Sequence, residues 1–210
     1  MTSKHFFVNL SEATNQEYLS TIDDKVTTIS NLGPRELAGM CPQSHAFHIA
    51  FNGNLVYCWH NNKPAVIKKR PLDFTTVRHL LGMTMIYFPQ AMIVAYGEDE
   101  IYVNNSAAMA LTTAPPTTSG LGYLLTNYHS IYQLKIRVAD NIELQKLLYL
   151  LETNVQADME FTQLGEQELL ITPTADVANA IAVVLAKYGY GMNDMALLGD
   201  IISRQPASVK

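Results

Sequence analysis

Five side chains with metal-binding or nucleophilic chemistry stand close together in the sequence: Cys41, His45, His48, Cys58 and His60. Thiolates and imidazoles are the ligands that zinc prefers in proteins. No Cys-x-x-Cys pair occurs among them, so their spacing alone does not identify a zinc site. Three roles therefore stay open for the cluster: a metal site, a nucleophilic cysteine served by a histidine, and a structural role in a half-buried sheet.

A β-hairpin decides how these side chains are arranged. The Asn-Gly pair at 52–53 is typical of a tight turn with positive φ, and it predicts a hairpin over 45–60. A three-residue turn places His48 opposite Cys58. A two-residue turn places three of the side chains on one face, as candidate ligands of a zinc ion: His45, Cys58 and His60.

The same cluster supports one enzymatic hypothesis, a metal- or cysteine-dependent hydrolase. Such an enzyme needs a cleft at the hairpin and a carboxylate that orients the imidazoles, for which Asp73 and Glu98 are available. The sequence has no P-loop, no Gly-x-Ser-x-Gly elbow and no complete dinucleotide-binding glycine pattern. A catalytic role therefore depends on this cluster and on no known motif.

Two groups of charged residues complete the candidate chemistry. The acidic run at 98–100 can bind a hard cation, although three adjacent carboxylates at a hairpin tip are more typical of a solvated turn. A basic group can contact phosphate or RNA, although a solvated strand end is the more common explanation. Its members are Lys63, Lys68, Lys69 and Arg70.

The elements that position these groups are strands and helices in mixed order. In the first half, the pattern predicts strands at 6–8, 26–29 and 65–68, a hairpin over 91–103, and helices at 15–22, 74–88 and 105–111. In the second half, strands at 131–138, 159–164 and 169–172 accompany helices capped by Asp140 and opened by Pro173, and a last short helix at 193–202.

These elements predict an α+β fold with mixed, mainly antiparallel sheets and helices packed on one face. The second half reads strand, helix, strand, strand, helix, which is the order of a ferredoxin-like sandwich such as a small-ligand regulatory module. A Pro- and Thr-rich stretch at 112–122 predicts a linker or loop between two regions. The expected domains are therefore 1–111 and 123–210, which can also pack as one.

The middle of the chain is nearly uncharged. Between His79 and Leu134 the formally charged side chains are confined to 98–100. A membrane span needs about 20 apolar residues, and Pro89 interrupts this stretch. Interface cores are depleted in charge and enriched in tyrosine, which favours contact with a second copy or another protein. The candidate contact residues are Tyr102, Tyr123, Tyr128 and Tyr132.

The overall composition narrows the function. A net charge of −5 disfavours binding to nucleic acid, and two cysteines are too few for a disulfide framework. The N-terminus shows no secretory signal, which predicts a cytoplasmic protein. The leading hypothesis is a non-enzymatic interaction or assembly protein, homo-oligomeric, whose composition resembles that of phage-encoded accessory and structural proteins. The hydrolase and a small-ligand-binding module are the alternatives.

Overall fold

The structure is a computed structural model that describes residues 5–10, 26–38, 46–117, 120–155 and 158–198. Contacts within the chain divide it into two compact units. The parallel-sheet unit comprises 1–32, 40–68 and 176–210, and the antiparallel-sheet unit comprises 33–39 and 69–175. The fold is α+β, as predicted.

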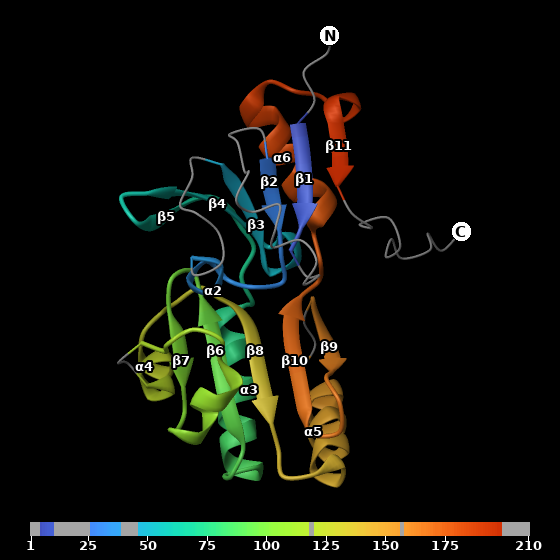
Figure 1. Cartoon of the computed structure of the whole chain (residues 1–210). Helices are drawn as coiled ribbons and strands as arrows, with labels where there is room; N and C mark the ends of the chain where they lie inside the picture. Colours follow the sequence, from blue (N-terminus) through green and yellow to red (C-terminus); the bar gives the residue numbers. More distant parts are fainter. Residues whose placement is uncertain (1–4, 11–25, 39–45, 118–119, 156–157, 199–210) are drawn as a thin grey trace, which may run out of the picture. The chain divides into compact units, whose positions relative to one another are not determined.

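The parallel-sheet unit is built on a sheet with the order β11-β1-β2-β3-β4-β5. Neighbours among β11, β1, β2 and β3 run parallel, and β4 is antiparallel to β3. In Figure 1 the arrowheads of β1 and β11 point the same way. The strands are β1 (His5–Asn9), β2 (Val26–Ile29), β3 (Phe47–Ala50), β4 (Leu55–His60), β5 (Lys63–Lys69) and β11 (Met195–Leu198).

Helix α6 (Val177–Tyr188) covers one face of this sheet. Its apolar stripe packs against side chains that alternate along the strands, since successive strand residues point to opposite faces. Gly189, with a φ of 73°, ends the helix in the left-handed conformation. The buried cluster consists of Phe7, Ile29, Ile49, Val56, Ala180, Ile181, Val184 and Leu185. Short 3₁₀ turns are η2 (Phe51–Gly53) and η4 (Met192–Asp194).

The antiparallel-sheet unit has the strand order β7-β6-β8-β10-β9, and every neighbouring pair is antiparallel. Its strands are β6 (Met92–Gly97), β7 (Ile101–Val103), β8 (Ile131–Arg137), β9 (Met159–Gln163) and β10 (Glu168–Pro173). Its helices are α2 (Pro34–Leu37), α3 (Phe74–Tyr87), η3 (Ala107–Leu111), α4 (Leu121–Thr126) and α5 (Asn141–Asn154).

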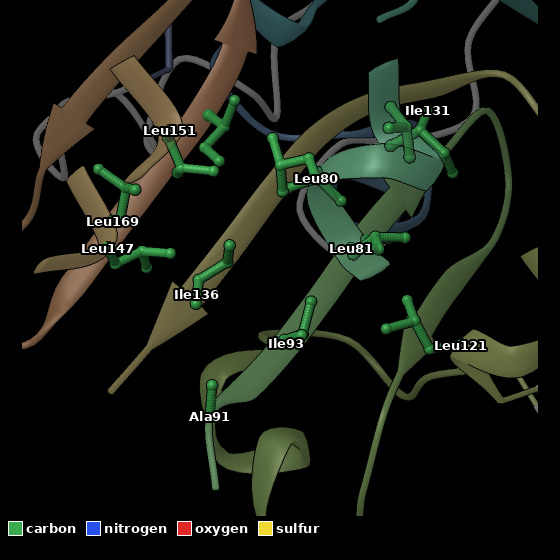
Figure 2. Close-up of a cluster of buried hydrophobic side chains, with 14 of the residues drawn as sticks. Leu80, Leu81, Ala91, Ile93, Leu121, Ile131, Ile136, Leu147, Leu151 and Leu169 are labelled. Carbon is green, nitrogen blue, oxygen red and sulfur yellow. The ribbon is translucent and has the colours of Figure 1, made fainter. Parts of the chain in front are cut away.

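One hydrophobic core joins the long helices to the antiparallel sheet. Figure 2 shows Leu80 and Leu81 of α3 and Leu147 and Leu151 of α5 on the side of the sheet that carries Ile136. The predicted N-caps hold both helices: Asp73 accepts from the Thr76 N–H at 2.8 Å, and Asp140 from the Glu143 N–H at 2.8 Å. The uncharged stretch supplies much of this core. Among the described residues, no helix is long and apolar enough to cross a membrane.

Several local predictions are corrected. The segment 195–198 is not helical, because it pairs with β1 as a parallel strand. Pro173 ends β10, and α6 begins at Val177. The expected linker at 112–122 falls inside one unit, since β6 before it and β8 after it pair in one sheet. The predicted helix at 105–111 is a 3₁₀ turn, and the predicted helix at 15–22 lies outside the described residues.

Candidate functional site

Polar residues lie at the carboxyl edge of the parallel sheet. Asn9 is the last residue of β1, Ser30 directly follows β2, and the turn η2 follows β3. Parallel strands bring their carboxyl ends to the same edge, so these positions are neighbours although they are far apart in the sequence. Asn9 is half-buried and Ser30 is buried. We call this group, together with Lys68 and Asp176, the strand-end site.

Backbone hydrogen bonds connect the site from β2 to α6. The Asn52 N–H donates to the Ser30 carbonyl oxygen at 3.1 Å, and the Asp176 N–H donates to the Asn52 carbonyl oxygen at 3.0 Å. The Ser30 hydroxyl oxygen accepts from the Leu32 N–H at 2.9 Å. The ends of β2 and β3 and the start of α6 are thereby fixed relative to one another.

Lys68 brings a positive charge to the same place. Its ammonium lies 2.6 Å from a carboxylate oxygen of Asp176 and 3.4 Å from the Gly53 carbonyl oxygen. The side chains of Lys68 and Asp176 are 15% and 22% exposed. The pair therefore lies at the surface of the unit, partly shielded from water, where Coulomb interactions are stronger than in bulk solvent.

Gly53 permits the close approach of η2 to α6. It has a φ of 91°, which L side chains rarely adopt. A Cβ atom at this position would lie 2.4 Å from the Asp176 carbonyl carbon and 2.4 Å from the Val177 nitrogen. Any side chain at this position would push the turn away from the helix start, and the Asn52–Asp176 hydrogen bond would be lost.

His48 lies inside the parallel-sheet unit and is fully buried. Its Nδ1 is 2.7 Å from the Thr28 hydroxyl, and its ring stacks on Tyr57 with centroids 5.1 Å apart. Burial lowers its pKa from 6.5 to about 4, so the imidazole is neutral at neutral pH. Within the described part of the chain, its Nε2 has no hydrogen-bond partner.

Two of the three predicted metal ligands lie among the described residues. Cys58 is half-buried and His60 is exposed on β4, whereas His45 lies outside the described residues. The register pairs Phe47 with Cys58, as the two-residue turn predicts, although the connection contains η2, with positive φ at Phe51, Asn52 and Gly53. Among the described residues, no three His, Cys, Asp or Glu side chains lie close enough to hold a metal. The zinc site stays a prediction.

A second polar site lies within the antiparallel-sheet unit. A pocket of about 440 Å³ is formed around the β6–β7 turn and the segment 128–130. The Glu98 carboxylate accepts from the Tyr132 hydroxyl at 3.1 Å, and the Lys69 ammonium lies 3.5 Å from it. Burial, reinforced by the charge of Glu98, raises the pKa of the Tyr132 hydroxyl.

Glu100, a second acidic side chain of this pocket, is also paired. The Tyr102 hydroxyl donates to Glu100, and His129 Nδ1 lies 3.5 Å from the same carboxylate. The imidazole of His129 lies against the ring of Tyr123, with centroids 5.1 Å apart. These carboxylates therefore have partners within their own unit.

The four tyrosines predicted as contact residues gather near this pocket, but their exposure differs. Tyr102 and Tyr132 are buried, whereas Tyr123 and Tyr128 are exposed. The two buried tyrosines hydrogen-bond to the pocket carboxylates, and Tyr128 packs on Phe74 with ring centroids 5.0 Å apart. A role for them in binding a second copy or another protein stays an untested prediction.

Sequence reasoning missed most of the strand-end site. Lys68 was singled out as part of a basic group, but Asn9, Ser30 and Asp176 were not. The available signal was a polar residue at or just after each of the first two predicted strands. That signal has meaning only when the strands are known to be parallel neighbours, and strand order is not visible in the pattern.

Comparison with known proteins identifies the fold. No protein-family model matches the sequence, and no curated protein matches it. Among solved structures, a haloacid dehalogenase-like hydrolase from Bacteroides thetaiotaomicron has 16% identity and a TM-score of 0.72, covering 94% of this chain and 82% of that one. A HAD subclass IIB sugar phosphatase has 12% identity and a TM-score of 0.61, with coverage of 94% and 81%.

A haloacid dehalogenase-like hydrolase from B. subtilis is similar at 11% identity and a TM-score of 0.64, covering 94% of this chain and 83% of that one. These matches overturn the hypothesis of a non-enzymatic assembly protein, because the folded chain resembles hydrolases along nearly its whole length. They give no support to the descriptions as an oligomer, an interaction protein or a phage protein. At these identities the likeness establishes the fold alone: the chain has a haloacid dehalogenase-like fold.

Proposed function

We propose that this protein is a hydrolase of small phosphate esters, with sugar phosphates as the first substrate class to test. The observation that carries the proposal is the strand-end site, which gathers Asn9, Ser30 and Lys68 at one edge of the parallel sheet. The similarity to a sugar phosphatase over 94% of the chain supports the substrate class. Phosphate esters suit a site that offers hydroxyl, amide and ammonium donors.

The order of the strands favours this edge as a binding site. β1 pairs with β2 on one side and with β11 on the other, so the chain leaves β1 in one direction and returns on the opposite side. In open α/β sheets, ligands bind outside the carboxyl ends of the strands at such a point. Asn9 ends the strand at which this change of direction occurs.

Each described side chain has a limited chemical role. The Ser30 hydroxyl can donate to a phosphate oxygen, and the Asn9 amide can orient a phosphate oxygen or a water molecule. An amide is not a nucleophile towards phosphorus, so Asn9 forms no covalent intermediate. In the proposed reaction, water adds to phosphorus, the ester P–O bond breaks, and the products are an alcohol and inorganic phosphate.

The described part of the site does not suit a metal ion. Hard cations such as Mg²⁺ prefer carboxylate oxygens, and the carboxylate that the described residues place here is that of Asp176, which Lys68 neutralises. No step of the proposed reaction is therefore routed through a metal. Assays with and without added magnesium nevertheless belong in the test, because many phosphoryl-transfer enzymes use it.

The test is phosphate release from a panel of sugar phosphates by the purified full-length chain. We expect release from at least one ester, and Ser30→Ala should lower kcat/KM about tenfold, because a hydrogen bond to a charged phosphate contributes about 1.5 kcal/mol or more. Ser30→Thr keeps the hydroxyl and should retain more activity than Ser30→Ala.

Ser106→Ala is the matched control, because Ser106 is exposed in the antiparallel-sheet unit and no side-chain hydrogen bond is assigned to its hydroxyl at the start of η3. Its kcat/KM should equal that of the unmodified protein. Absence of phosphate release from every ester would overturn the proposed reaction. Release that Ser30→Ala leaves unchanged would mean that the reaction occurs elsewhere on the molecule.

A further inference from the structure

We propose that Lys68 binds the phosphate group of the ligand and that Asp176 positions it. This inference rests on the proposed function, because it names a phosphate-binding residue of the same site. Lys68 lies at the end of β5, a strand separated from β1 by three others in the sheet order. Its ammonium nevertheless reaches the turn η2 and the start of α6.

The hydrogen bonds of Lys68 leave room for a ligand. An ammonium has three N–H donors. Asp176 takes one at 2.6 Å, and the Gly53 carbonyl oxygen lies at the long distance of 3.4 Å. Among the described residues, no third hydrogen bond is assigned to this ammonium. The side chain is 15% exposed, so a phosphate oxygen can reach this donor from solvent.

The position of Lys68 is distinctive among the cations of its unit. Within its described residues, the parallel-sheet unit has two other Lys or Arg side chains, Lys63 and Lys187. Lys63 begins β5 and Lys187 lies in the last turn of α6. Since β5 and α6 carry Lys68 and Asp176 at their opposite ends, these two lysines lie away from the strand-end site.

Asp176 behaves as a positioning residue for this lysine. It is the N-cap of α6, where an aspartate normally accepts a hydrogen bond from the first turn of the helix. No such side-chain capping bond is present. The carboxylate is turned instead towards Lys68 and towards the Asn179 amide at 3.2 Å. A capping bond stabilises a helix start, so the ion pair forms at the expense of the helix cap.

The backbone links this ion pair to the rest of the site. Asp176 is held by Asn52, and Asn52 by Ser30, through the two backbone hydrogen bonds described above. Gly53 allows the close contact that these bonds require. Lys68 is thereby placed in a fixed relation to the Ser30 end of β2, which suits two donors that bind one phosphate group.

A purely structural ion pair is the competing explanation, and phosphate protection of the unmodified protein separates the two. The full-length chain is treated with a lysine-acetylating reagent with and without inorganic phosphate, and the rate at each lysine is followed by mass spectrometry. We expect saturating phosphate to slow acetylation of Lys68 at least about threefold and to leave Lys187 unchanged. Equal rates at Lys68 with and without bound phosphate would overturn the inference.

Variants supply the second measurement. Lys68→Met should weaken binding of inorganic phosphate, measured by titration calorimetry, at least about tenfold, which corresponds to about 1.4 kcal/mol. Lys68→Arg should retain part of the affinity, and Asp176→Asn should lose less than Lys68→Met. Lys187→Met is the control and should bind phosphate normally. If Lys68→Met fails to fold, the acetylation experiment on the unmodified chain still tests whether Lys68 binds phosphate.

The outcomes separate the two proposals. Phosphate release and phosphate binding by the unmodified chain, with normal binding by a folded Lys68→Met variant, would leave the proposed function standing and refute the role of Lys68. A lower urea midpoint with unchanged phosphate affinity would show the structural ion pair alone. Absence of both phosphate release and phosphate binding in the unmodified chain would refute both proposals.

Discussion

The two units of this protein are built from similar elements, but one sheet pairs its central strands in parallel and the other pairs all its strands antiparallel. This difference in pairing decides where polar residues lie. Parallel neighbours β11, β1, β2 and β3 bring their carboxyl ends to one edge, where Asn9 ends β1 and Ser30 follows β2. Antiparallel neighbours send successive ends to opposite edges. The polar pocket of the antiparallel-sheet unit is instead built around one hairpin turn and the segment before β8.

The interiors of the two units also differ in the polar side chains that they bury. The antiparallel-sheet unit has the larger hydrophobic cluster, and its described buried polar side chains are Glu36, Thr84 and Thr172. The parallel-sheet unit buries Thr27, Thr28, Ser30, His48 and Asn54. Buried polar groups cost free energy unless they are hydrogen-bonded. Among these side chains, the His48 imidazole has a ring nitrogen without a partner and a lowered pKa, so the parallel-sheet unit carries a pH-sensitive group in its interior, and the predictions below test this contrast.

The largest effect is expected for Gly53→Ala. The new Cβ would clash with the backbone of Asp176 and Val177, and alanine is disfavoured at a φ of 91°. We expect a loss of about 4 kcal/mol in the free energy of unfolding, from strain and overpacking together. Urea unfolding followed by tryptophan fluorescence measures it, since the single tryptophan, Trp59, lies in this unit.

Gly165→Ala is the control in the antiparallel-sheet unit. Gly165 has a similar φ of 80°, but a Cβ atom there meets nothing within 4 Å. The cost should therefore be about 1 kcal/mol, from backbone conformation alone. Equal costs at the two glycines would show that the contact between η2 and α6 is not as close as the structure has it.

The next largest effect is the pH dependence caused by His48. The unfolded chain binds a proton at this side chain below about pH 6.5, whereas the folded chain keeps it neutral down to about pH 4. Stability is therefore fully present above this window and is lost as pH falls through it, by about 3 kcal/mol at most. Urea midpoints of Trp59 fluorescence at about pH 7 and about pH 4.5 measure the loss.

His48→Gln removes this titration and should flatten the pH dependence in that window. His60→Gln is the control, because His60 is exposed and its removal should leave the slope as it is. A His48→Gln variant with the original slope would assign the pH dependence to other groups and would contradict the role given to the buried imidazole.

The smallest effect is expected for Asp140→Ala in the antiparallel-sheet unit. The Asp140 carboxylate accepts from the Glu143 N–H at 2.8 Å and satisfies one donor of the first turn of α5. Its removal should cost about 1 kcal/mol, measured by urea unfolding followed by circular dichroism. Asp140→Asn keeps an acceptor at this position and should cost less. A cost equal to that of Asp140→Ala would show that charge, and not the hydrogen bond, matters here.

Local patterns predicted many elements because their causes are local. The stripe of Leu144, Leu147 and Leu151 with an N-cap at Asp140 predicts α5, and the structure has it at Asn141–Asn154. The alternation along 131–138 predicts a strand, and the structure has β8 at Ile131–Arg137. The run at 195–198 was predicted as helical because a short apolar segment has no decisive period, and pairing with β1 makes it a strand.

Most of the candidate site could not be predicted from the sequence, for a different reason. Asn9, Ser30 and Asp176 are separated by long stretches of chain, and each is an ordinary polar residue in its local context. Their meeting depends on strand order and on the packing of α6, which are long-range choices. The four tyrosines illustrate the same limit, since composition alone does not distinguish the buried Tyr102 and Tyr132 from the exposed Tyr123 and Tyr128.

The sequence by itself determined the α+β class, the two capped helices and most of the strands, because hydrophobic period, capping residues and turn residues act within a few positions of each other. Only the tertiary structure decided that β11, β1, β2 and β3 are parallel neighbours and that the chain enters and leaves each unit repeatedly. Those decisions place Ser30, Lys68 and Asp176 together, because strand pairing and helix packing join residues with no local relation in the sequence.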